Sequence, residues 1–229
     1  MMKALIWKEW CEQRWKLAFG CVLIGGFAAV SLRARIWPDI GVTVLSAMFG
    51  SALMALFVSM GLFACERNEG TLGTLLVLPV EKWKVFAVKM GVGALVCAGP
   101  VILVGVLVFI IGGGRELSAR QTGMYFSVGI VFGVAAFVWM AVFGVRRASE
   151  TKAGLVGIAV LVGWFLFFGF DDVVRIPWLR WWLQAVLPLQ FDLTSPHDIL
   201  KRVLVQSAVV SGLLVWGCGR FGKEGRVEK

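Results

Sequence analysis

Glu66-Arg67-Asn68-Glu69-Gly70-Thr71-Leu72 opens the stretch of sequence that decides the fold, and the chain continues as Gly73-Thr74-Leu75-Leu76-Val77-Leu78-Pro79-Val80 before it reaches Lys89. This charged segment, residues 66–89, separates two long uncharged runs, residues 40–65 and 90–114. Each run exceeds the roughly 20 apolar residues that a helix needs to cross the hydrocarbon core of a bilayer. The sequence therefore predicts two membrane helices with a water-exposed loop between them.

Segment 66–89 carries an apolar ridge of its own. Leu72, Leu75 and Leu76 are three and four residues apart, so they share one face of a short helix. A short helix that lies across an exposed loop with one apolar face is suited to docking on a partner protein. The simpler alternative is a solvated loop that contains one helical turn.

The composition of the whole chain also indicates a membrane protein. Its 229 residues are 59% hydrophobic, more than a soluble domain of this length requires. Six segments contain no Asp, Glu, Lys, Arg or His: residues 17–32, 40–65, 90–114, 123–145, 153–170 and 203–219. Because backbone groups in lipid must be hydrogen-bonded internally, we expect an all-α protein. The expected architecture is one transmembrane domain, residues 1–229, with six transmembrane helices.

Small residues recur four positions apart within two of these segments. Gly129 and Gly133 form one such pair, and Ser46 and Gly50 form another. Small residues at this spacing allow helix backbones to approach closely. We expect them to serve packing within the chain.

The charge distribution predicts the orientation of the chain. If both termini are cytoplasmic, the inner segments hold fifteen of the 23 basic residues and the outer loops hold the other eight. Cytoplasmic loops are enriched in Lys and Arg, so this bias favours cytoplasmic termini and a cytoplasmic segment 66–89. The net charge of +9 is divided among loops rather than gathered on one soluble face. We therefore expect no nucleic-acid partner.

Residues 3–16 form an amphipathic element before the first uncharged segment. A helical wheel places Ile6, Trp7, Trp10, Cys11 and Trp15 on one broad face, and Lys8, Glu9, Glu12, Gln13 and Lys16 on the other. This pattern predicts an interfacial helix in the inner headgroup layer, after which the chain turns into the membrane. A signal peptide is the alternative, which three Trp and two Glu residues disfavour.

No group of residues predicts an enzyme. Residues 217–224 nearly fit a phosphate-binding loop, but a membrane segment precedes them and five residues follow. His197 is the only histidine and has no catalytic partners in the sequence pattern. The six uncharged segments also lack the ionisable groups that ion-coupled carriers use. We expect no catalytic residue, metal site or cofactor in this chain, and an energy source outside its membrane part.

Segment 66–89 resembles the cytoplasmic coupling loop of the permease subunit of ATP-binding-cassette (ABC) exporters of the type-2 class. In that family a Glu-rich turn leads into Gly-Thr-Leu, a Leu pair, a Pro-Val break and a downstream Lys. The matching residues are Glu66, Glu69, Gly70, Thr71, Leu72, Leu75, Leu76, Pro79, Val80 and Lys89. The resemblance implies that all of these except Val80 dock a separate cytoplasmic ATPase subunit, which binds ATP and Mg. It also implies a second permease chain, identical or not, in the same lipid bilayer.

The expected outer loop at residues 171–202 is too apolar for a free loop and too broken for a span. The resembled family often has a re-entrant element at this place. Two interpretations stay open. One is an outer gate that uses Pro177, Trp181, Pro188 and Phe191, and the other is a surface helix that only anchors the loop.

Taken together, these patterns predict a permease subunit of an ABC exporter in the bacterial cytoplasmic (inner) membrane. The rival hypothesis is a non-transporting membrane scaffold or assembly protein that docks a cytoplasmic partner through segment 66–89. The sequence does not specify the substrate.

Overall fold

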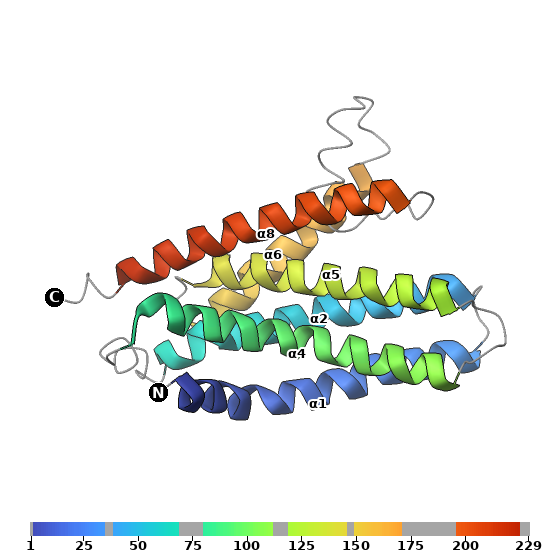
Figure 1. Ribbon diagram of the computed structural model, residues 1–229, viewed down its shortest axis with the longest axis horizontal. Helices are drawn as coiled ribbons and strands as arrows, with labels where there is room; N and C mark the ends of the chain where they lie inside the picture. Colours follow the sequence, from blue (N-terminus) through green and yellow to red (C-terminus); the bar gives the residue numbers. More distant parts are fainter. Residues whose placement is uncertain are drawn as a thin grey trace. The chain divides into compact units, whose positions relative to one another are not determined.

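The computed structural model of the chain is built from α-helices, drawn in sequence colours in Figure 1, and describes residues 2–34, 39–68, 80–111, 119–145, 149–170 and 196–224. The helices are α1 (Met2–Ala34), α2 (Asp39–Asn68), α4 (Lys82–Ile111), α5 (Ala119–Gly144), α6 (Glu150–Phe170) and α8 (Pro196–Glu224). Each helix overlaps one of the six uncharged segments, and α1, α2, α6 and α8 contain theirs completely. The described ranges contain no strand, so the expected all-α class is confirmed.

The helices extend beyond the uncharged segments that predicted them. α4 begins at Lys82, eight residues before Met90, and therefore includes Lys89. α1 runs without a break from Met2 to Ala34, so the turn into the membrane expected after Lys16 is absent. Charged residues such as Lys and Glu are good helix formers, so a loss of hydrophobicity does not end a helix.

Parts of these helices are apolar enough to lie in a bilayer. By length and composition, three stretches of the described residues can cross a membrane: Lys82–Leu107 in α4, Phe126–Gly144 in α5 and Val203–Phe221 in α8. Shorter apolar stretches are Met48–Phe63 in α2 and Thr151–Gly163 in α6. Large apolar side chains on several helices point outward, among them Leu95 (65% exposed) and Val215 (74% exposed). Exposed apolar surface on this scale is suited to lipid rather than water.

The chain divides into two compact units. The first comprises Met1–Val58 and Ala87–Phe137, and the second comprises Ser59–Phe86 and Val138–Lys229. The first unit thus holds α1 and one part each of α2, α4 and α5. The second unit holds the end of α2, the start of α4, the end of α5, and α6 and α8.

Close glycine contacts fix the direction of the helices in the first unit. A methyl group added at Gly20 of α1 would lie 2.6 Å from Met54 Cε of α2, and one added at Gly50 of α2 would lie 2.6 Å from Ile24 Cγ1 of α1. Residue numbers therefore increase along α1 in the direction in which they decrease along α2. The two helices are antiparallel, as two consecutive spans must be.

Contacts of α4 extend this alternation. Gly99 of α4 lies beside Leu17, and Gly25 lies beside Val104, so α1 and α4 run parallel. Antiparallel packing of α4 on α5 is shown by two contacts: Gly93 with Phe137 and Gly105 with Phe126. The four helices of this unit thus alternate in direction along the chain.

The predicted packing role of two small residues is confirmed within this unit. Gly133 of α5 faces Ser51 of α2, where an added methyl group would lie 2.7 Å from the Ser51 Cβ, and Gly50 faces Ile24. Without side chains of their own, these glycines allow neighbouring helices to approach closely.

We expect Gly93→Ala to destabilise the first unit by about 1–3 kcal/mol, the usual cost of overpacking a well-filled core. The added methyl group would overlap the ring of Phe137, which is itself fully buried. The matched control is Gly91→Ala, two residues earlier in α4, where nothing lies within 4 Å of the added group. Gly91→Ala should be neutral or stabilise by about 0.5–1 kcal/mol, because Ala is the better helix former. Unfolding in mixed detergent micelles measures both, and equal stabilities would contradict the packing described.

Candidate functional site

Segment 66–89 is joined to the described structure at both ends. α2 ends at Asn68 and α4 begins at Lys82, so the segment connects these two helices. Seven of the predicted docking residues lie outside the described residues: Glu69, Gly70, Thr71, Leu72, Leu75, Leu76 and Pro79. The candidate outer-gate residues Pro177, Trp181, Pro188 and Phe191 also lie outside them.

The other two predicted docking residues belong to helices rather than to a loop. Glu66 lies in the last turn of α2 and is 3% exposed. Lys89 lies in the interior of α4, where its side chain is 1% exposed. The docking role of both residues stays a prediction. α4 begins before the uncharged segment 90–114, so this helix also carries Lys82, Lys84 and Lys89.

Three residues at the start of α4 stabilise its first turn. The backbone carbonyl of Glu81 accepts a hydrogen bond from the Lys84 N–H at 2.9 Å. Its carboxylate pairs with Lys84 Nζ at 3.1 Å and accepts a hydrogen bond from the Trp83 indole N–H. The hydrogen bond from Lys84, followed by that from Trp83, holds the pKa of Glu81 below its usual value. A negative charge at this position also favours a helix N-terminus. α4 therefore has a defined start immediately after the segment.

Three phenylalanines join the helices on either side of the segment. In the second unit, the ring of Phe63 in α2 lies 5.8 Å from that of Phe86 in α4, between ring centroids. Phe221 in α8 lies 5.6 Å from Phe63 and 5.8 Å from Phe86. All three side chains are buried. Aromatic pairs at such distances gain about 0.5–1.5 kcal/mol beyond their area burial. We call Phe63, Phe86 and Phe221 the aromatic cluster.

The remaining helices of the second unit contact the same ends. Gly217 of α8 lies so close to Val142 of α5 and Phe86 that an added methyl group would be 3.0 and 3.1 Å from them. A methyl group added at Gly154 of α6 would lie 2.5 Å from Met60 Cε of α2. The second unit therefore gathers the ends of α2, α5 and α8 with the starts of α4 and α6.

The first unit contains a buried ion pair that the sequence pattern did not predict. Lys89 Nζ of α4 donates a hydrogen bond to Glu9 Oε1 of α1 at 2.8 Å, and both side chains are 1% exposed. Gln13, one turn further along α1, is also buried. The signal in the sequence is weak: a carboxylate on residues 3–16 and an ammonium next to segment 90–114, with nothing to indicate that they meet.

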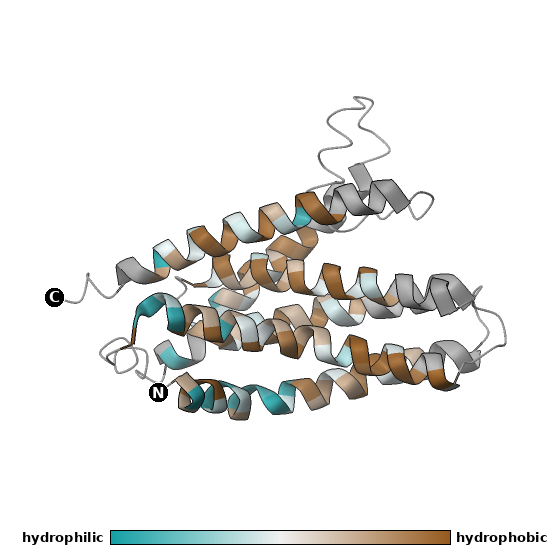
Figure 2. Ribbon diagram, viewed as in Figure 1, coloured by the Kyte–Doolittle hydropathy of each residue, from teal (hydrophilic) through white to brown (hydrophobic). Residues whose placement is uncertain are grey.

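The exposed face of α1 is the tryptophan face. Trp7 is 67% exposed and Trp15 is 73% exposed, whereas Glu9 and Gln13 point inward. Figure 2 shows hydrophilic residues along the first half of α1. Residues 3–16 are amphipathic as predicted, but Glu9 and Gln13 of the face expected to be polar and outward are buried. Glu12 and Arg14 are exposed as well, so indoles and charged groups lie together on the outer surface of this stretch, which suits a membrane–water interface.

These features define an integral membrane protein built from helices that carry apolar side chains on their outer surface. Comparison with protein families identifies the family of this membrane protein. The family described as ABC-2 family transporter protein matches residues 17–176, more than half of the chain. The chain belongs to this family and is an ABC-2 family transporter membrane protein. No curated protein matches it.

Proposed function

We propose that this chain is the permease subunit of an ATP-driven exporter and that segment 66–89 docks its ATPase. The observation that carries the proposal is the aromatic cluster. Phe63 in α2 and Phe86 in α4 lie on opposite sides of the stretch 69–81 that joins these helices, and their rings stack at 5.8 Å with an interplanar angle of 18°. Any displacement of the segment therefore acts on α2 and α4 together, and through Phe221 on α8.

In this proposal the energy comes from a separate cytoplasmic ATPase subunit that binds ATP and Mg²⁺. Closure of two ATPase subunits on ATP moves segment 66–89, and packed helices pass that movement on as a rigid-body shift. Two permease chains, identical or different, enclose one pathway in the bacterial cytoplasmic membrane. The permease itself performs no chemistry.

The proposed topology has six spans with both termini in the cytoplasm. It requires the ends of α2, α5 and α8 and the starts of α4 and α6 to lie on one side of the membrane. Their packing within the second unit supports this requirement, as does the excess of basic residues in the same parts of the sequence. A cysteine placed at Gly70 in a chain without other cysteines should react with an impermeant thiol reagent only after cells are permeabilised. Reaction in intact cells would rule out the docking role.

We expect Leu75→Asp to weaken co-purification of the ATPase at least about tenfold, the effect of losing an interface hot spot. The proposed helix places Leu72, Leu75 and Leu76 on one face, so an ionised side chain at position 75 would be buried against the partner. The matched control is Thr74→Asp, which puts the same charge on the opposite face and should leave the complex intact.

The outcome of this experiment separates the permease from the scaffold hypothesis. Wild-type affinity of the Leu75→Asp chain would show that the apolar ridge does not dock the ATPase. If the ridge does dock a partner but the partner does not hydrolyse ATP, the scaffold hypothesis is the correct one.

A further inference from the structure

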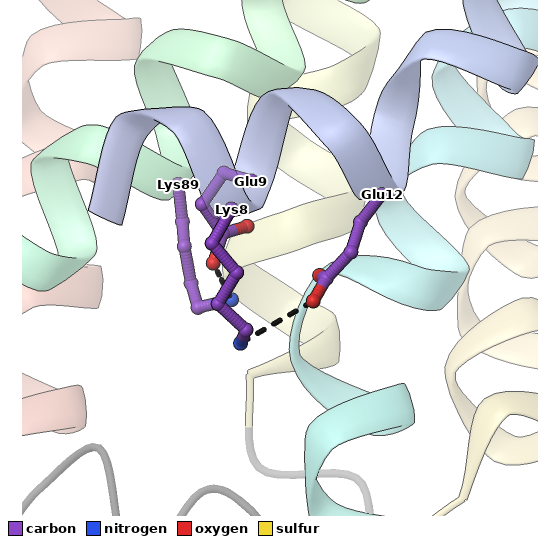
Figure 3. Close-up of polar contacts among 4 residues, drawn as sticks. All are labelled: Lys8, Glu9, Glu12 and Lys89. Atoms are coloured by element: carbon purple, nitrogen blue, oxygen red, sulfur yellow. Dashed lines mark hydrogen bonds and ion pairs between the residues drawn. The ribbon is translucent and has the colours of Figure 1, made fainter. Parts of the chain in front are cut away.

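The Glu9–Lys89 ion pair is buried, unlike the ion pair that lies beside it on α1. Figure 3 shows both: Lys89 reaches Glu9, and Lys8 reaches Glu12 one turn along the same helix. The Lys8–Glu12 distance is 3.3 Å and its side chains are 40% and 46% exposed, against 2.8 Å and 1% for Glu9–Lys89. The two pairs have the same chemistry but differ in exposure and in what they connect. Lys8–Glu12 lies within one helix, whereas Glu9–Lys89 joins two helices across 80 positions of sequence.

The buried pair resists separation because of its surroundings. Drawing the ammonium from the carboxylate would break a hydrogen-bonded pair of charges away from water, which is more costly than opening an exposed pair. Ionisable groups held inside a membrane protein are, for this reason, commonly functional. The first half of α1 and the first turns of α4 are therefore held at a fixed distance.

Contacts further along the same two helices reinforce this connection. An added methyl group at Gly20 of α1 would lie 2.8 Å from Pro100 Cγ of α4, and one at Gly99 of α4 would lie 3.2 Å from Leu17 Cδ1. The parallel helices thus touch at Lys89, at Gly99–Pro100 and at Val104. Between Lys89 and Gly99, α4 is helical throughout. At Pro100 it lacks one backbone hydrogen bond, because proline has no N–H, and this makes the turn easier to bend.

The position of Lys89 relates the pair to the proposed mechanism. Lys89 lies seven residues after Lys82, the first residue of α4, which is about 10 Å along the helix. A movement that enters α4 at Lys82 reaches Lys89 before it reaches Pro100. α1 has no covalent connection to α4 except through α2, and the ion pair connects the two helices at Lys89.

We propose that Glu9 and Lys89 are positioning residues that make the first half of α1 and the first turns of α4 move as one body when the ATPase acts. This inference rests on the proposed function, because it extends the route from segment 66–89 to α1. Without the pair, the first half of α1 would lose its connection to α4 at Lys89 and would follow α4 only through the contacts further along the two helices.

The test uses the permease–ATPase complex with the variant Glu9→Met/Lys89→Met. Replacing both members of a buried ion pair with apolar residues of similar volume commonly preserves stability, so this double variant should fold and bind the ATPase. Lys8→Met/Glu12→Met is the matched control, since it removes the neighbouring exposed pair in the same helix. Spin labels at Ile6 of α1 and Ala87 of α4, both exposed, report the distance between the two helices.

In the wild-type complex, the label distance should be the same with and without ATP and vanadate. The double-methionine variant should still bind the ATPase subunit, but a second distance between the labels should appear when ATP is added. The ratio of the populations with the second and the first distance should change by about tenfold, a typical coupling strength. The Lys8→Met/Glu12→Met control should match the wild type. A distance that changes with ATP in the wild type, or that stays constant in the double-methionine variant, would overturn the inference. Failure of the proposed function looks different, because no ATPase would then co-purify even with the wild-type chain.

Discussion

Replacing Lys89 alone with methionine should destabilise the protein by about 3–5 kcal/mol, the usual cost of removing one member of a buried ion pair. Lys89→Met leaves the Glu9 carboxylate inside the first unit without the ammonium that lies 2.8 Å away. Glu9→Met should have a similar effect for the opposite reason, since it removes the carboxylate that accepts a hydrogen bond from the buried ammonium. The cost is that of an unbalanced charge rather than of lost contacts.

The charge-swapped variant, Glu9→Lys with Lys89→Glu, separates these two causes. It restores neutrality and should recover a large part of the stability lost in either single variant. Denaturation in mixed micelles, followed by circular dichroism, measures all three. If Lys89→Met were as stable as Lys8→Met, whose side chain belongs to the exposed pair, the ion pair would not be buried as described.

The second large effect is expected in the aromatic cluster, where Phe86→Ala should cost about 3–5 kcal/mol. Phe86 is 3% exposed and contacts the rings of both Phe63 and Phe221, so its removal opens a cavity next to three helices. Trp83→Ala is the matched control. Trp83 lies three residues earlier in α4 and is 55% exposed, so its loss leaves no cavity.

The two substitutions also differ in their expected effect on coupling. Phe86→Ala loosens the contact between α2, α4 and α8. ATP hydrolysis should therefore continue, but the movement of α8 that hydrolysis causes should become smaller. Cross-linking between α4 and α8 in the presence and absence of ATP measures this effect. Equal stability of the Phe86→Ala and Trp83→Ala proteins would show that the cluster does not hold these helices together.

The helical architecture could be predicted from the sequence because it depends on long uncharged runs. Four of the six runs lie wholly inside a helix, from 17–32 in α1 to 203–219 in α8, and most of the other two, 90–114 and 123–145, lies in α4 and α5. The ends of the helices could not be predicted in the same way. Hydrophobicity marks the part of a helix that suits the bilayer core, whereas backbone hydrogen bonding and local propensity decide where the helix stops.

The burial of residues 3–16 shows a second limit of sequence patterns. A helical wheel correctly separates Trp7 and Trp15 from Glu9 and Gln13, but it does not say which face is outside. Glu9 points inward where it meets Lys89, a residue 80 positions away that supplies the opposite charge. The aromatic cluster is non-local in the same sense, since Phe63, Phe86 and Phe221 come from three helices. Contacts of this kind follow from tertiary packing and produce no repeating pattern of apolar and polar residues in the sequence.

The separation of Glu9 from Lys89 also has a consequence for biosynthesis. At about 5–20 residues per second, the ribosome takes roughly 4–16 s to add the 80 positions between the two residues. During that interval Glu9 cannot form the pair with Lys89, so the first half of α1 must fold without it. The packing of α1, the first helix to be synthesised, is therefore completed only after Lys89 of α4 has been translated.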